Sequence, residues 1–404
     1  MPRLNNLYFW FSACLSYTRG SLASPTSDHF HGSTPYMTCA TWTLPVAATA
    51  DNVIFDVPHV DSDIDVPDYV WYEDTWSTPN LAARTRSTLH VDDTFGINVQ
   101  LCMPTLDTKG KRQILQIATP GFGFDKRYWD VEVESDKYSY VRAAVKAGYS
   151  ILTYDRLGTG LSDKPDAYNI VQAPLQVEIL KSLTILARNG ELTKAAEPHF
   201  AGGLAVSNFT KFVHIGHSFG STVTNALQAQ YPELSDGAIQ TGWLVSEHLG
   251  TFGQAAFGYQ YARQNDPIKF NDRGSGYIVT GTKNSFQQLF LAKALLDPKM
   301  LNYGNSIKQP GTVGEGAPTG PIIGIPAIDF KGPLQIFMGE HDFPICDGDC
   351  KGVYNVTELK KSSFPKASAL EVYIQPGTGH GCALHKNATA GYQVMFDFLD
   401  SNGL

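Results

Sequence analysis

The stretch Phe212-Val-His-Ile-Gly-His-Ser-Phe-Gly-Ser221 (FVHIGHSFGS) decides how the rest of the chain is interpreted. An apolar run typical of a buried strand leads into Gly-His-Ser-Phe-Gly, and the residues that follow have a helical pattern. A serine between two glycines on a sharp strand-to-helix turn stands above the edge of a sheet, at the positive end of the helix. The pentapeptide therefore predicts that Ser218 is a nucleophile. The alternative is a surface serine at a helix N-terminus.

Strand and helix patterns alternate on both sides of this stretch. We expect strands at 98–103, 113–118, 149–154, 211–215, 239–245, 333–338 and 370–374, and helices at 138–146, 171–188, 285–296 and 388–399. Such alternation indicates βαβ units, and hence an α/β fold with a mostly parallel sheet and helices on both faces. Residues 248–325 are too many for a bare connection, so they are interpreted as an inserted cap between core segments 25–247 and 326–404.

A serine hydroxyl is a poor nucleophile until a base takes its proton. The sequence Thr378-Gly-His-Gly381 directly follows the expected strand 370–374. Because chemistry gathers at the carboxyl ends of parallel strands, His380 is predicted to be the base for Ser218. His385 is the nearest alternative, and His217 is expected to point away from the serine.

The base in turn needs a carboxylate that holds its tautomer and stabilises the imidazolium ion. The sequence Met338-Gly-Glu-His-Asp-Phe-Pro344 follows the expected strand 333–338, and it predicts Asp342 as that carboxylate. Glu340 and Glu247 are the alternatives. The chain order serine, aspartate, histidine is the order expected of an α/β-hydrolase.

Two hydrogen-bond donors are needed for the oxyanion of a tetrahedral intermediate. The backbone amide of Phe219, directly after the serine, is one candidate. The other is the amide of Phe122 in Thr119-Pro-Gly-Phe-Gly123, which follows the expected strand 113–118. A simple turn is the alternative for this second segment.

Five motifs together resemble the α/β-hydrolase superfamily, over roughly residues 95–247 and 326–404. They are PGFG (120–123), DRLGTGLS (155–162), GHSFG (216–220), GEHD (339–342) and GTGHG (377–381). The resemblance implies transfer of an acyl group to water through an acyl-serine, on a small ester or acyl substrate, without a metal or an organic cofactor. Pro120-Gly121 stands where many members have His-Gly. The early strand from Cys39 to Val46 and CDGDC (346–350) are also similar to secreted fungal members.

The aromatic residues of segment 248–325 suggest an apolar or aromatic acyl pocket, although they can equally be plain core. A biosynthetic tailoring enzyme (cyclisation, C–C bond formation or thioester release) and a capped aminopeptidase-like enzyme are alternative functions on the same fold. A non-catalytic binding module is a third alternative, which the intact serine, histidine and carboxylate disfavour. A serine at this turn argues against dehalogenase and epoxide hydrolase chemistry.

The composition excludes some partners. The 404 residues include 31 Lys and Arg against 39 Asp and Glu, for a net charge of −8, with no basic stripe suited to nucleic acid. No apolar run reaches a length of about 18 residues, which a membrane-spanning helix requires. The sequence does not indicate an oligomeric state.

The N-terminus predicts a secreted protein. The apolar residues 7–17 follow Arg3, and small residues at 21–24 suit cleavage of a signal peptide spanning 1–24. Three Asn-x-Ser/Thr triplets, at Asn208, Asn355 and Asn387, point the same way.

Removal of Cys14 with the signal would leave five cysteines, which allow at most two disulfides and one free thiol. The pairs expected are Cys39 with Cys102 and Cys346 with Cys350. A zinc site built from Cys346, Cys350, Cys382 and a histidine is the competing interpretation, and its spacing is not that of a zinc ribbon or finger.

Overall fold

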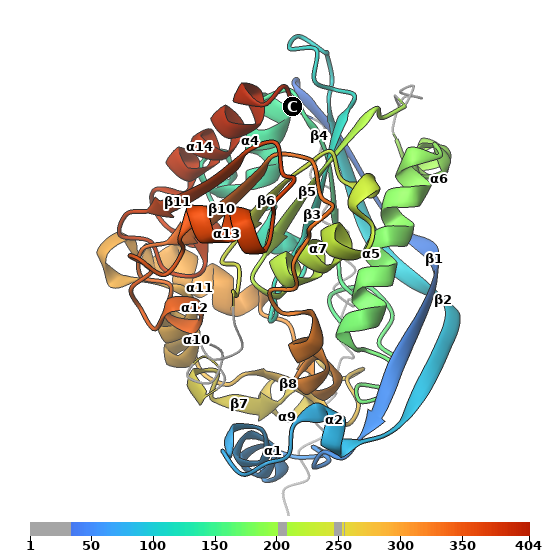
Figure 1. Ribbon diagram of the computed structural model, residues 1–404, viewed down its shortest axis with the longest axis vertical. Coiled ribbons are helices and arrows are strands. Elements are labelled where there is room, and N and C mark those ends of the chain that lie inside the picture. Colours follow the sequence, from blue (N-terminus) through green and yellow to red (C-terminus); the bar gives the residue numbers. More distant parts are fainter. Residues whose placement is uncertain (1–33, 201–207, 246–252, 254) are drawn as a thin grey trace, which may run out of the picture. The chain divides into compact units, whose positions relative to one another are not determined.

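The computed structural model describes residues 34–200, 208–245, 253 and 255–404; the expected signal peptide and Glu247 lie outside them. The core is a sheet of eight strands in the order β1-β2-β4-β3-β5-β6-β10-β11 (Figure 1). This sheet, with helices on both faces, confirms the predicted α/β-hydrolase fold. The strands are β1 (Met37–Phe55), β2 (Thr85–Pro104), β3 (Ile114–Thr119), β4 (Ser150–Tyr154), β5 (Lys211–His217), β6 (Gly237–Thr241), β10 (Leu334–Gly339) and β11 (Leu370–Gln375).

The direction of the strands brings the predicted site residues to one edge. β1, β2 and β4 pair antiparallel, whereas the pairs from β4 through to β11 are all parallel. The carboxyl ends of β3, β5, β6, β10 and β11 therefore lie side by side. The loops that leave these ends carry Phe122, Ser218, Asp342 and His380.

Alternate side chains of each central strand enter two different cores. Leu115 and Ile117 of β3 pack with α5 and α7, whereas Ile114 and Ala118 pack with α4 and α14. This alternation is what a sheet buried on both faces requires. The helices lie on opposite sides of the sheet in Figure 1. They are α4 (Tyr140–Lys146) and α14 (Ala388–Ser401) on one face, with α3 (Ser135–Tyr138) beside them, and α5 (Ala173–Arg188), α6 (Glu191–Ala196), α7 (Phe219–Gln230) and α13 (Val356–Ser362) on the other.

The structure differs from the sequence prediction in three places. The predicted helix 285–296 is wrong at its C-terminal end, since α10 covers Lys283–Phe290 and the backbone of Leu291 is extended. Residues 37–55 and 85–104 form two long strands paired from Met37 opposite Pro104 onward, where only the parts 39–46 and 98–103 were expected as strand. The predicted strand 239–245 is wrong at both ends, since β6 covers 237–241. Gly242 ends it because its φ of +56° turns the chain out of the sheet.

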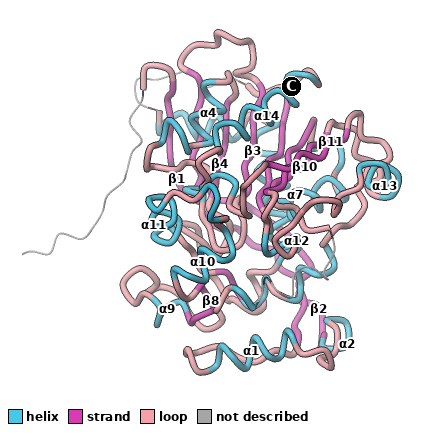
Figure 2. The backbone as a smooth tube through the Cα atoms, turned by 90° about the vertical axis from the view of Figure 1, so that its left-hand side faces the viewer, coloured by secondary structure: helices cyan, strands magenta, loops and turns pink. Residues whose placement is uncertain are grey.

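The described residues between β6 and β10 are here called the β6–β10 insertion. It contains a small antiparallel sheet, which packs against the connection between β1 and β2 through Val66, Tyr69, Tyr259 and Ile278. Figures 1 and 2 both show α1 of that connection beside the small sheet. The elements are α1 (Asp65–Asp74) and α2 (Leu81–Arg84) in the connection, and β7 (Tyr259–Tyr261), α9 (Ala262–Asn265), β8 (Tyr277–Thr280), α10 (Lys283–Phe290), α11 (Pro298–Ile307) and β9 (Gly311–Thr312) in the insertion.

Both predicted disulfides are confirmed. Cys39 and Cys102 are register partners on β1 and β2, and Cys346, at the end of α12 (Phe343–Cys346), is bonded to Cys350. Cys382 is a buried free thiol. The zinc alternative is wrong in this structure because two of its thiolates are joined to each other.

The described residues contain no group of three or more His, Cys, Asp or Glu side chains placed to hold a metal ion. None of the helices in the described part of the chain combines the length and the apolar character that crossing a bilayer requires.

The two disulfides are expected to stabilise the fold unequally, because the constraint on the unfolded chain grows with the loop that is closed. They span 63 and 4 residues in sequence, which corresponds to about 4 and about 2 kcal/mol. Denaturant unfolding should therefore find the double variant Cys39→Ser/Cys102→Ser less stable than Cys346→Ser/Cys350→Ser. Equal losses in the two variants would contradict this order.

Candidate active site

Ser218 occupies a strained turn between β5 and α7. Its φ of 54° and ψ of −122° lie in a region that a residue with a side chain seldom adopts. The flanking glycines make the turn possible: a Cβ at Gly220 would lie 2.3 Å from the carbonyl oxygen of Thr119, and one at Gly216 would lie 2.5 Å from Cα of Ser221. The side chain of Ser218 lines a pocket at the carboxyl edge of the sheet.

His380 and Asp342 are brought together in the same region. Nδ1 of His380 lies 2.7 Å from Oδ2 of Asp342, and both side chains are buried. The other oxygen, Oδ1, accepts from the backbone amide of Ile345 at the start of α12. Because an ionised carboxylate only accepts hydrogen bonds, Nδ1 of His380 carries the proton and Nε2 keeps its lone pair. His380 lines the same pocket as Ser218.

The alternative residues are engaged elsewhere. Glu340 forms an ion pair with Lys351 and accepts from the amide of Gly377, and the hydrogen bond with Lys351 is the main reason that the pKa of Glu340 is lowered. His385 bonds only backbone groups: Nδ1 lies 2.9 Å from the carbonyl oxygen of Gly381, and Nε2 accepts from two amides. Glu340 therefore does not take the role predicted for Asp342, and His385 does not take the role predicted for His380.

His217 lies behind the turn. Its ring stacks on Tyr128 with 4.3 Å between ring centroids, and its Nδ1 donates to the hydroxyl of Thr241, which itself donates to the carbonyl of Gly216. Burial holds the pKa of His217 well below its usual value, and the nearby His380 adds to that effect. A neutral His217 does not repel a positive charge on His380, whose ring lies 4.7 Å away.

The two amides predicted as oxyanion donors lie close to Ser218. The Phe219 amide is the first of α7, so it has no acceptor within the helix. In the described part of the chain, the Phe122 amide has no backbone or side-chain acceptor either. Its loop passes close to the serine, since a Cβ at Gly121 would lie 3.0 Å from Cβ of Ser218.

Arg156 fixes this loop, and sequence reasoning gave it no role although it lies in the DRLGTGLS motif. Its guanidinium donates to the carbonyls of Pro120 and Gly121, at 3.1 and 3.3 Å, and lies 4.6 Å from the ring centroid of Phe219. It also forms a buried ion pair with Glu315 of the β6–β10 insertion. One cation therefore contacts both segments that are predicted to carry the oxyanion donors, as well as the insertion.

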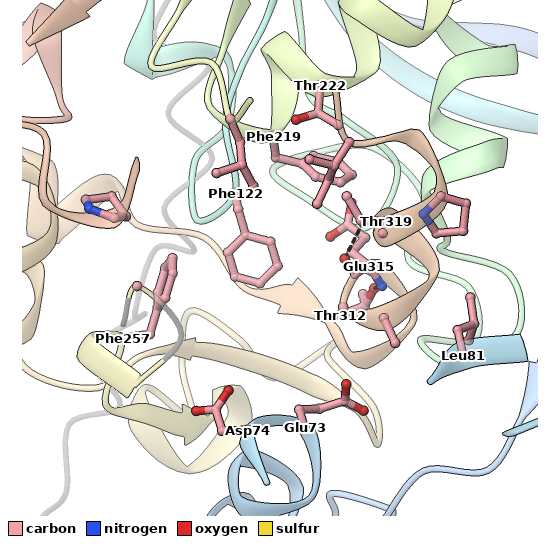
Figure 3. Close-up of a pocket in the computed structure, with 18 of the residues that line it drawn as sticks. Glu73, Asp74, Leu81, Phe122, Phe219, Thr222, Phe257, Thr312, Glu315 and Thr319 are labelled. Atoms are coloured by element: carbon pink, nitrogen blue, oxygen red, sulfur yellow. Dashed lines mark hydrogen bonds between the residues drawn. The ribbon is translucent and has the colours of Figure 1, made fainter. Parts of the chain in front are cut away.

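The pocket has a volume of about 560 Å³, within the usual range for small-molecule sites. Its walls come from the sheet edge, from the β6–β10 insertion and from the connection between β1 and β2 (Figure 3). Sequence reasoning missed this connection, because a segment so far from the motifs carries no signal of its own. Its contribution to the lining is Tyr69, Glu73, Asp74, Thr78, Pro79, Asn80, Leu81, Ala82 and Arg84.

No protein-family model matches the chain, and no curated protein is similar to it in sequence. Solved structures with a similar shape include a thermophilic esterase from Thermogutta terrifontis with malate bound, at 12% identity and a TM-score of 0.47 over 77% of this chain and 96% of that chain. Est1E from Butyrivibrio proteoclasticus with ferulic acid bound has 14% identity and a TM-score of 0.44 over 76% and 96%. Sequence identities and TM-scores this low do not allow the function of those proteins to be assigned to this chain.

Gly242 lies against the histidine and carboxylate pair. A Cβ there would lie 2.8 Å from Cε1 and 2.9 Å from Nδ1 of His380. We expect Gly242→Ala to displace the imidazole and break its bond to Asp342, which NMR detects as loss of the hydrogen-bonded Nδ1 proton signal. Gly403→Ala is the matched control, because Gly403 also has a positive φ but nothing within 4 Å of its Cβ. An unchanged signal in Gly242→Ala would contradict the geometry.

Three buried histidines should stay neutral across the physiological range. Burial lowers the pKa of His214 to about 3 and that of His385 to about 4, and that of His217 is also far below 6.5. Below pH 6.5 the unfolded chain binds protons that the native state excludes, so these groups make the free energy of unfolding decrease as pH falls toward 4. NMR titration of the imidazoles checks this, and a midpoint above pH 6 for any of the three would contradict it.

Proposed function

We propose that the chain is a serine hydrolase that cleaves a carboxylic ester, or a related acyl substrate, through an acyl intermediate on Ser218. The observation that carries the proposal is the convergence of a strained serine and a histidine–aspartate pair on one pocket. The ends of three sheet strands, β5, β10 and β11, supply these parts from distant segments of the sequence, which a surface serine at a helix terminus does not explain.

In the proposed reaction, Oγ of Ser218 attacks the carbonyl carbon while its proton passes to Nε2 of His380. Asp342 accepts from Nδ1 and stabilises the imidazolium ion. The amides of Phe122 and Phe219 donate to the oxyanion of the tetrahedral intermediate. When the intermediate collapses, the leaving alcohol takes the proton from His380. Water then attacks the acyl-serine by the same route in reverse, releasing the acid.

We also propose that residues 248–325 act as the cap of this site, between core segments 25–247 and 326–404. Support comes from the part of the insertion that is described, which supplies aromatic walls to the pocket. Phe257 packs edge-on against Phe122 with 5.4 Å between ring centroids, and it stacks on Tyr259 at 4.8 Å. These rings suit an apolar or aromatic acyl group.

Secretion, with glycosylation, is part of the proposal and follows the likeness to secreted fungal members. Two disulfides support it, since such bonds persist in oxidising compartments. Asn208 and Asn355 are exposed, and Asn355 uses only its oxygen to cap α13, so both can carry a glycan. Asn387 is less suited, because its Nδ2 donates to Pro376 and Thr378.

A fluorophosphonate probe should label the intact protein covalently, and Ser218→Ala should abolish labelling. Ser368→Ala is the control, since Ser368 is an exposed loop serine outside the pocket. Asp342→Asn should lower ester turnover by about three or more orders of magnitude, because His380 then loses the acceptor that sets its tautomer. Steady hydrolysis of p-nitrophenyl esters is expected. Absence of labelling in the intact protein would exclude the proposed function.

A further inference from the structure

The pocket has an acidic region across from Phe219 and Thr222 (Figure 3). Glu73 and Asp74, the last residues of α1, lie there. Glu73 is neutralised by Arg84, which donates to its two carboxylate oxygens at 2.7 and 3.0 Å. Asp74 is partly buried and has no ion pair among the described residues. Desolvation, followed by the neighbouring charge of Glu73, raises the pKa of Asp74.

Glu315 supplies a second carboxylate whose bonds are incomplete. Its side chain is 1% exposed, and Oε1 is taken by Arg156 and by Nε2 of Gln176, the latter at 2.9 Å. Oε2 is buried with no donor in the described part of the chain. Thr312 and Thr319 bond the backbone of Glu315, while Arg156 and Gln176 hold its carboxylate in the pocket wall. A buried oxygen without a donor is costly, and a ligand donor would relieve that cost.

The carboxylates of Asp74 and Glu315 both lie in the wall of the pocket. Tyr259, also in the pocket wall, has its pKa raised by burial and by the negative charges of Asp74 and Glu315, so both acids lie near one phenol. Among the described residues, Glu73 is paired with Arg84 and Glu315 with Arg156, so that Asp74 is the carboxylate of this group left without an ion pair. A neutral acyl chain leaves this carboxylate unmatched, whereas a cation with several donors matches both the charge of Asp74 and the free Oε2 of Glu315.

We infer that Asp74 and Glu315 bind a protonated amine carried by the substrate, so that the substrates are amine-bearing esters or amides. The reaction in this inference rests on the proposed function, whereas the binding of the amine does not depend on it. Asp74 and Glu315 act as specificity residues that accept hydrogen bonds from the ammonium group. Apolar walls from Phe122 and Phe257 cover the chain between the amine and the carbonyl carbon at Ser218.

The test compares two isosteric substrates, p-nitrophenyl 6-aminohexanoate and p-nitrophenyl heptanoate, at pH 7. We expect the natural protein to favour the amino ester in kcat/KM by tenfold or more, mainly through KM. Asp74→Asn and Glu315→Gln should each reduce that ratio at least fivefold. Asp68→Asn is the matched control, because Asp68 is exposed on the same helix, lies outside the pocket and carries the same charge. A ratio near one in the natural protein, or a ratio unaltered by Asp74→Asn, would overturn the inference.

A binding measurement separates this inference from the proposed function. Calorimetry with hexylammonium and with 1-hexanol needs no turnover, and hexylammonium should bind at least tenfold more tightly to the natural protein but not to Asp74→Asn. Selective binding without fluorophosphonate labelling of Ser218 would retain the amine site and reject the hydrolase. Labelling together with equal binding of the two compounds would reject the amine site and retain the hydrolase.

Discussion

The close packing around Ser218 is the constraint on which the site depends. The turn lies directly against the end of β3, where a Cβ at Gly220 would lie 2.3 Å from the carbonyl oxygen of Thr119. This contact presses the loop after β3 against the start of α7, and the amides of Phe122 and Phe219 come close to the serine for that reason. The same packing leaves Ser218 in a positive-φ conformation that the surrounding structure must maintain. The packing that strains Ser218 is therefore the same packing that brings the amides of Phe122 and Phe219 close to it, as the proposed chemistry requires.

Arg156 extends that constraint beyond the sheet. Its bonds to Pro120 and Gly121 orient the loop after β3, while its ion pair with Glu315 holds the β6–β10 insertion. The pair is fully buried, so loss of either partner would leave an uncompensated charge in the interior. The loop after β3 and the pocket wall that contains Glu315 are thus held by one interaction. This arrangement couples the chemistry proposed at Ser218 to the selectivity proposed at Glu315.

Much of the core was predictable because its signals are local. Buried strands read as short apolar runs, and glycine-rich turns follow them, so β3, β5, β10 and β11 were expected within a few residues of their bounds. The full length of β1 and β2 was missed, because their alternating exposed residues include many Thr and Asp that resemble turns. Pairing between them, including Cys39 beside Cys102, stabilises what neither stretch indicates alone.

The sequence by itself determined the type of fold and the candidates Ser218, Asp342 and His380, because each depends on residue type and position relative to a strand end. Only the tertiary structure decided which carboxylate meets His380, that Arg156 supports the loop after β3, and that Glu73 and Asp74 reach the pocket. The physical reason is that these contacts join segments separated by many tens of residues, and no local pattern records them. Long-range packing decides which charges are paired, and among the described residues of the pocket wall it leaves Asp74 without an ion pair.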